Sequence, residues 1–139
     1  MTRSRILMPI LVAMAICLGS TARAGNADFE AIISRQIEAF GNGDGATAFG
    51  FASPALQRMF QTPENFMSMV QRGYAAVYSP RRFSFASTET DPQGRPVQIV
   101  EVVDQDGRVW TARYTFEQQP DGTWRIAAVT LDKAPGADV

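Results

Sequence analysis

Two strands and the turn between them occupy residues 109–126, whose sequence is VWTARYTFEQQPDGTWRI. Apolar and polar residues alternate on both sides of Pro120-Asp121-Gly122, and a period of two is typical of strands that bury one face. A type I turn with Gly122 in the left-handed conformation makes Gln119 and Thr123 a pair across the hairpin. We therefore predict an antiparallel hairpin whose register follows from that pair.

Counting back from the turn pairs residues of opposite charge with each other and apolar residues with each other, as cross-strand packing favours. The expected pairs are Glu117 with Arg125, Phe116 with Ile126, and Tyr114 with Ala128. Two earlier turns, Asp91-Pro92-Gln93-Gly94 and Asp104-Gln105-Asp106-Gly107, have the same chemistry. Three turns predict four antiparallel strands from Arg82 onward. In the middle hairpin the expected pairs are Asp104 with Arg108, Val102 with Trp110, and Val100 with Ala112.

One face of this sheet collects most of the large apolar residues and should lie under the helices: Val100, Val102, Trp110, Ala112, Tyr114, Phe116, Trp124 and Ile126. The first hairpin agrees less well, because the same counting puts Phe83 and Phe85 on the opposite face, beside Glu101 and Val103. Either a β-bulge shifts the first strand or the second face is covered as well. The sequence leaves both alternatives open.

The first half of the chain has helical periodicity. Apolar residues recur at helical spacing from Asn26 to Phe40, and Asp44 can cap a short helix after the glycines that follow. Ser53 and Thr62 each precede a proline, which is typical of an N-cap and the first helical position. The fourth helix should run from Thr62 to Ser79-Pro80. Helices followed by a strand meander predict an α+β fold.

The N-terminus has the parts of an export signal. Arg3 and Arg5 precede the apolar run 6–18, and Ala22-Arg23-Ala24 suits a signal peptidase. The apolar run is too short for a membrane-spanning helix, which needs roughly 20 residues. We therefore expect residues 1–24 to be a cleaved signal peptide and the protein to be periplasmic or secreted, with no stable membrane anchor after cleavage.

The rest of the chain has the length of one domain, for which we expect the bounds 25–133, followed by a flexible C-terminal tail at 134–139. The whole chain has a formal net charge of −1, and removing the signal also removes three arginines. The domain is therefore acidic and lacks the basic charge on which phosphate-backbone binding depends. We expect no nucleic-acid partner.

Several segments resemble a known family. Phe29 to Phe40, Gly43-Asp44 and Ala48-Phe49 are similar to the opening helices of the nuclear-transport-factor-2-like (cystatin-like cone) superfamily. A narrower set resembles the bacterial family called domain of unknown function 4864: Phe51-Ala52-Ser53-Pro54, Arg72-Gly73-Tyr74, Val77-Tyr78, Pro80-Arg81, Tyr114-Thr115 and the run from Pro120 to Ile126. The resemblance implies a cone of helices packed on a curved four-stranded sheet, and no assigned activity.

The residue inventory restricts catalysis. The chain contains no histidine, and its one cysteine, Cys17, lies in the expected signal peptide. General acid and base roles would therefore fall to carboxylates and tyrosines, yet most carboxylates lie in helix caps or tight turns. Met59, Met67 and Met69 occur at helical spacing and are interpreted as core filler rather than metal ligands. We expect no cofactor and no metal.

Five residues are candidates for lining a cavity: Tyr74, Tyr78, Gln98, Trp110 and Tyr114. A tyrosine offers an apolar ring and a hydroxyl that needs a partner, although the same residues can pack in a core with the hydroxyl at the rim. Gln98 is a strongly polar residue on an apolar face, where it could orient a ligand or lie at the open end of the sheet.

Three functions are compatible with the sequence, and they differ in whether a cavity exists and what it does. We expect an exported, non-catalytic domain that binds a small apolar molecule or a partner protein of the cell envelope. The alternatives are a cofactor-free isomerase or hydro-lyase using pocket tyrosines and a carboxylate, and an interaction module with a filled core. We also expect a homodimer through the outer sheet face, which should present Phe83 and Phe85 together with Val97, Ile99, Val103, Val109, Val129 and Leu131.

Overall fold

The computed structural model describes residues 26–134; the expected signal peptide (1–24) and residues 135–139 of the expected tail lie outside this range. Five helices precede four strands, which confirms the α+β class. The helices are α1 (Asn26–Gly41), α2 (Gly45–Gly50), α3 (Pro54–Phe60), α4 (Pro63–Gly73) and α5 (Ala75–Tyr78). The strands are β1 (Arg82–Thr90), β2 (Pro96–Val103), β3 (Val109–Gln118) and β4 (Trp124–Lys133).

Short polar side chains start the helices where the sequence predicts. The side-chain oxygens of three N-cap residues accept hydrogen bonds from backbone N–H groups in the first turn: Asp44 from Thr47, Ser53 from Leu56 and Thr62 from Asn65. Each bond satisfies a donor that the helix leaves unpaired. The helical boundaries of the first half are therefore set locally.

The fourth helix differs from the prediction because it is broken. α4 ends at Gly73, Tyr74 has φ −136° and ψ 43°, and the short α5 begins at Ala75. Backbone hydrogen bonds continue on both sides of the break, since Tyr74 N donates to Val70 O at 2.8 Å and Val77 N donates to Tyr74 O at 3.0 Å. The break redirects the chain at Tyr74, and it brings this side chain to the cavity described below.

The sheet is an antiparallel meander in the order β1-β2-β3-β4, as predicted. The final glycine of each turn has positive φ, between 80° and 85° at Gly94, Gly107 and Gly122. The turn-flanking pairs are bonded as expected, with Gln119 N donating to Thr123 O at 2.7 Å. The register of the β2–β3 hairpin is the one counted from its turn, Val102 with Trp110 and Val100 with Ala112.

A bulge in β1 decides between the two alternatives for the first hairpin. The pairing shifts by one residue between Phe85 and Thr88, which places Phe83 opposite Val102 and Phe85 opposite Val100. Both phenylalanines therefore face the helices and pack against the core. The prediction that they lie on the outer face, at a dimer interface, is wrong, because turn counting cannot detect an extra residue within the strand.

A second bulge, in β4, changes the end of the last hairpin. Phe116 pairs with Ile126 as predicted, but Thr115 then pairs with Ala128, so Ala127 is the extra residue. Tyr114 faces Val129 rather than the predicted Ala128. The shift also turns Val129 and Leu131 to the inner face, where they pack against the core, so their predicted place on the outer face is wrong as well.

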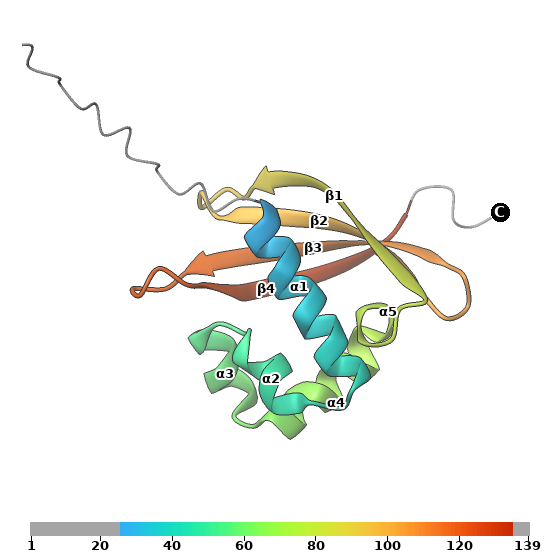
Figure 1. The fold of residues 1–139 in the computed structure, drawn as a ribbon, viewed down its shortest axis with the longest axis horizontal. Helices are drawn as coiled ribbons and strands as arrows, with labels where there is room; N and C mark the ends of the chain where they lie inside the picture. Colours follow the sequence, from blue (N-terminus) through green and yellow to red (C-terminus); the bar gives the residue numbers. More distant parts are fainter. Residues whose placement is uncertain (1–25, 135–139) are drawn as a thin grey trace, which may run out of the picture.

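The core lies between the inner face of the sheet and the helices. Figure 1 shows α1 running obliquely across the strands, with α2, α3 and α4 gathered around its C-terminal half. The N-terminal half of α1 seals one end of the sheet, where the ring of Phe29 stacks on Phe116 at 4.4 Å and meets Trp124 edge-on at 5.2 Å. The predicted inner face is thus confirmed, although Trp110 and Trp124 are only partly buried.

The edge of the sheet next to β4 is closed by the segment that joins α2 to α3. Ile126 N donates to Phe51 O and Ser53 N donates to Ile126 O, both at 2.8 Å, which makes a parallel bridge. The guanidinium of Arg125 donates to Gly50 O at 2.6 Å. Arg125 lies opposite Glu117 as predicted, but its guanidinium donates to carbonyls of this segment, so it ties the helices to the sheet.

The outer face shields its own aliphatic residues. Arg113 on β3 pairs with Glu89 on β1, and this ion pair spans the intervening strand β2. Val97 and Ile99 lie on β2 beneath that span and are only 3% and 9% exposed. The long stems of paired charged residues can cover apolar surface in this way.

No helix among residues 26–134 is long and apolar enough to cross a membrane.

Candidate functional site

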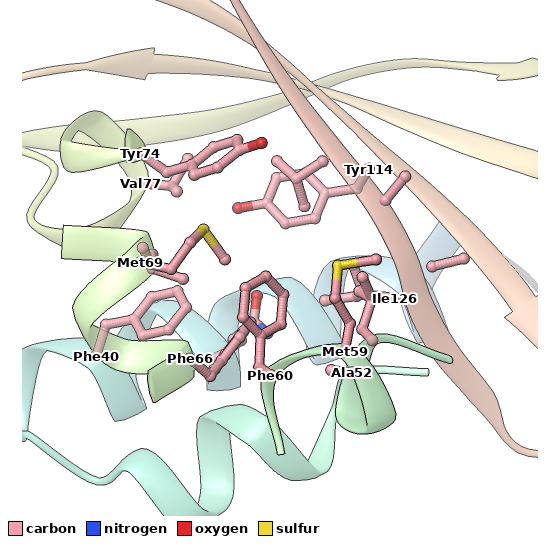
Figure 2. A pocket seen from close by; sticks show the side chains of 16 residues that line it. Phe40, Ala52, Met59, Phe60, Phe66, Met69, Tyr74, Val77, Tyr114 and Ile126 are labelled. Carbon is pink, nitrogen blue, oxygen red and sulfur yellow. The ribbon is translucent and has the colours of Figure 1, made fainter. Parts of the chain in front are cut away.

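A cavity of about 250 Å³ lies where the helices do not fill the inner face of the sheet. Its walls come from α1, α3, α4, the Tyr74 break, β3 and β4. The lining residues are Gln36, Phe40, Ala52, Leu56, Met59, Phe60, Phe66, Met69, Val70, Tyr74, Val77, Tyr114, Ile126, Ala127, Ala128 and Val129. Figure 2 shows the labelled aromatic and methionine side chains converging on one common space. The pocket is therefore mainly apolar.

Tyr114 supplies the most unusual group in this pocket. Its side chain is fully buried, with 0% exposure, and its hydroxyl oxygen has no hydrogen-bond partner. Buried polar groups in proteins are nearly always bonded, and leaving one unpaired costs stability. Burial raises the pKa of the Tyr114 hydroxyl well above its ordinary value. The hydroxyl is therefore neutral and keeps its proton, which suits it to donate a hydrogen bond rather than to act as a base.

Tyr74 lies on the opposite wall from Tyr114. Figure 2 shows the two rings extending toward each other across the cavity, Tyr74 from the helix break and Tyr114 from β3. Tyr74 is only partly buried. Of the five candidate residues from the sequence, these two tyrosines are the ones that line this pocket.

Gln98 lies beside Tyr114 in the sheet but has another task. The two residues are cross-strand partners, yet the Gln98 side chain turns to the bulge of β1. Its Nε2 donates to Ala86 O at 3.1 Å and to Ile99 O at 3.0 Å, while its Oε1 has no partner. Gln98 therefore supports the bulge that directs Phe83 and Phe85 inward.

Tyr78 and Trp110 line a second, more open depression with Leu131, between α5 and the β2–β3 turn. The ring of Tyr78 packs on Phe40, with 5.7 Å between centroids. The indole N–H of Trp110 donates to Asp104 Oδ2 at 2.9 Å, and this hydrogen bond lowers the pKa of the Asp104 carboxyl. Both side chains thus make structural contacts, and neither lines the Tyr114 pocket.

Gln36 is a polar lining residue that the sequence analysis missed. Its Nε2 donates to Ala48 O at 3.1 Å, and only 3% of the residue is exposed. The signal was present, because Gln36 lies three residues after Ile33 and four before Phe40 on the buried stripe of α1. A polar residue at such a position needs a partner within the fold.

Two of the three methionines that were predicted to be core filler, Met59 and Met69, line the pocket, whereas Met67 packs against the core. Met69 lines the pocket, and Figure 2 shows its side chain turned toward the tyrosines. Met59 also lines the pocket, but it is 69% exposed and lies at the rim, so its assignment as core filler is wrong. Flexible thioether side chains adapt to irregular apolar shapes. The rim is therefore both apolar and adaptable.

Charged side chains lie elsewhere. No aspartate, glutamate, lysine or arginine is among the pocket-lining residues. Arginines of the turns and strands pair with carboxylates outside the pocket: Arg95 with Asp91, Arg108 with Asp106, and Arg113 with Glu89. Between residues 26 and 134, no group of three acidic, histidine or cysteine side chains is placed to hold a metal ion. The lining of the pocket is therefore uncharged, and its polar side chains are Gln36, Tyr74 and Tyr114.

The sequence profile of the family described as Domain of unknown function (DUF4864) matches residues 22–139, which includes every residue that lines the pocket. The chain belongs to this family. No curated protein matches it. This DUF4864 chain is also similar to a 2.5 Å structure from Catenulispora acidiphila, with 15% identity over 78% of this chain and 90% of that chain and a TM-score of 0.48. A likeness of this size leaves the function open, and the nuclear-transport-factor-2-like superfamily stays a prediction.

Proposed function

We propose that this DUF4864 domain is a binding module that takes a small, mainly apolar molecule into the Tyr114 pocket. The observation that carries the proposal is a formed cavity whose lining is apolar except for Gln36, Tyr74 and Tyr114. Sites for small molecules are concave and mainly apolar, with a few polar groups that fix orientation. This pocket has that composition.

The size of the cavity limits the ligand. Pockets for drug-sized molecules have volumes of about 300–1,000 Å³, and an apolar cavity of about 150 Å³ is large enough for benzene. The volume of about 250 Å³ lies between these values. A ligand of one or two rings, or a short branched chain, is the expected size class.

Binding of 2-isopropylnaphthalene, followed by its fluorescence, tests the proposal. We expect saturable binding to the protein and a loss of at least about tenfold in affinity with Met69→Trp, which fills the pocket from α4. Ser68→Trp is the matched control, because Ser68 is exposed on the same helix and does not line the pocket. No saturable binding, or equal affinity in Met69→Trp and Ser68→Trp at unchanged melting temperature, would contradict the proposal.

The two alternatives receive less support. An isomerase or hydro-lyase mechanism needs a base near the tyrosines, and the residues that line the pocket include no carboxylate. A module with a filled core would have no cavity of this size. Protein binding keeps some support from Met59, which exposes an apolar side chain at the pocket rim. Native mass spectrometry of protein taken from its own host separates a retained small molecule from a retained protein.

Export is part of the same proposal. It is supported by Arg3 and Arg5, the apolar run 6–18 and the small residues around Ala24. N-terminal sequencing of protein recovered from the periplasm or medium should begin at Gly25. Recovery of the full-length chain from the cytoplasm alone would contradict this.

The cone assignment and the homodimer also remain proposals. Helices that cover one face of a four-stranded meander support the cone. For the dimer, the outer face keeps Val109 as a partly exposed aliphatic, while Val97, Ile99 and Val103 are already buried in the single chain. Light scattering at micromolar concentration, with Val109→Arg as the interface variant, tests association. A monomeric wild-type protein would contradict the dimer.

A further inference from the structure

The Tyr114 hydroxyl indicates which chemical group a ligand of this pocket should carry. It lies in the wall of an apolar cavity, is fully buried and has no hydrogen-bond partner. A phenolic O–H can donate one hydrogen bond, and an unpaired buried donor is costly. A ligand that brings an acceptor into the cavity would remove this cost at the moment of binding.

The other two polar side chains of the pocket, Gln36 and Tyr74, have less to gain from a ligand acceptor than Tyr114. The Gln36 amide already donates to Ala48 O on α2. Tyr74 faces Tyr114 from the opposite wall and is only partly buried, so water can reach this side chain. The donor that gains most from a ligand acceptor is therefore Tyr114.

The acceptor should be neutral. No lysine or arginine is among the residues that line the pocket, so an anion would enter apolar surroundings without a counter-charge. The raised pKa of Tyr114 supports this, since the same burial disfavours any charged form at this place. A carbonyl oxygen meets these conditions, because it accepts a hydrogen bond and carries no formal charge.

We propose that Tyr114 selects ligands that carry one neutral carbonyl oxygen, as in a ketone or ester, on an otherwise apolar body. This inference rests on the proposed binding function and adds the ligand class to it. Tyr114 acts as a specificity-determining residue. The apolar walls bind the body of the ligand, and the hydroxyl orients the ligand by donating a hydrogen bond to its carbonyl oxygen.

Three naphthalenes of similar size test the inference. The probes are 2-acetylnaphthalene, the matched hydrocarbon 2-isopropylnaphthalene, and the anion 2-naphthoate, each titrated against wild-type protein, Tyr114→Phe and Tyr74→Phe. We expect Tyr114→Phe to weaken the ketone by about threefold to tenfold, which is the net worth of one hydrogen bond, and to leave the hydrocarbon within about twofold. We expect 2-naphthoate to bind wild-type protein more weakly than the ketone.

The outcomes separate the two proposals. If the hydrocarbon binds wild-type protein but Tyr114→Phe changes both neutral probes equally, the carbonyl inference is overturned and the binding function stands. The inference also fails if 2-naphthoate binds more tightly than the ketone, or if Tyr74→Phe causes the selective loss instead. If none of the probes binds wild-type protein, the binding function fails and the inference falls with it. Thermal melting of each variant confirms that it is folded before titration.

Discussion

Two residues on β3 show how differently the same sheet face is used. Phe116 and Tyr114 are two positions apart, point to the same side and both have 0% exposure. Phe116 is stacked under Phe29 with 4.4 Å between ring centroids. Tyr114 instead borders a cavity and leaves its hydroxyl unpaired. Burial alone therefore does not distinguish a packed side chain from one that faces empty space.

The difference arises from what covers each residue. Phe116 lies beneath the first turns of α1, where large aromatic rings meet. Around Tyr114 the cover is interrupted, because α4 ends at Gly73 and the chain changes direction at Tyr74. The neighbouring strand contributes small residues, Ala127 and Ala128, at its bulge. A helix break above and small side chains beside it leave the volume unfilled.

The two buried side-chain atoms without partners belong to one cross-strand pair. They are Gln98 Oε1 and Tyr114 Oη, and within residues 26–134 no others share this property. At the Phe116 end the ring of Phe29 packs against both Phe116 and Trp124. The Phe116 end of the inner face is thus filled by aromatic rings, whereas the Tyr114 end retains two unpaired polar atoms.

Truncating the two rings should produce the largest contrast. Phe116→Ala removes a stacked ring from a filled region, and we expect a loss of about 3–5 kcal/mol in the free energy of unfolding. Tyr114→Ala should cost less, by about 1 kcal/mol or more, because its ring already borders empty volume. Urea denaturation of both variants gives the comparison. Equal losses would show that the Tyr114 end is packed as tightly as the Phe116 end.

Alkaline pH should reveal the buried hydroxyl. The pKa of Tyr114 is raised in the folded protein, while in the unfolded chain it has the ordinary value of about 10. Above pH 10 the unfolded state therefore binds fewer protons, and raising the pH favours unfolding. We expect the stability of wild-type protein to fall by up to about 1.4 kcal/mol per pH unit more steeply than that of Tyr114→Phe. Parallel pH profiles would contradict the burial of this group.

Turn chemistry predicted much of the fold, and the middle hairpin shows why. The turn that ends at Gly107 fixes the pair Asp104 with Arg108, and β2 and β3 then keep one register to their ends. The helix starts were likewise predictable, because an N-cap side chain acts on the backbone only three residues away. The hairpin register and the helix starts could therefore be predicted, because they depend on residues that are close in sequence.

The two bulges that depart from prediction depend on contacts between distant segments. The bulge of β1 is held by Gln98 from β2, and the bulge at Ala127 lies next to the segment that bonds Ile126. Neither leaves a mark in the pattern of its own strand. Two of the five candidate residues, Tyr74 and Tyr114, line the pocket, but the cavity itself depends on the break of α4 and could not be derived from residue spacing.

Replacing Gln98 tests the structural task assigned to the partner of Tyr114. Gln98→Met keeps the length of the side chain but removes the donor to Ala86 O and Ile99 O, so we expect a loss of about 1–2 kcal/mol in the free energy of unfolding. Gln118→Met is the matched control, because Gln118 is exposed on β3. Weaker binding of the naphthalene probes by Gln98→Met at unchanged stability would instead assign Gln98 to the ligand.

The smallest expected effect is a gain in stability, whereas most substitutions reduce stability. Tyr114→Phe removes a hydroxyl that has no partner and keeps the ring, so the ligand-free protein should gain about 1 kcal/mol in the free energy of unfolding near neutral pH. Tyr74→Phe is the control and should change stability by less than about 0.5 kcal/mol, because that side chain is partly exposed. Chemical denaturation of ligand-free protein measures both. A destabilised Tyr114→Phe would mean that the hydroxyl already has a partner in solution, such as a bound water, and the contrast with Phe116 would then be one of polarity rather than of packing. A stabilised Tyr114→Phe that also binds 2-acetylnaphthalene less well would show that the domain gives up stability at Tyr114 in exchange for selectivity in its ligand.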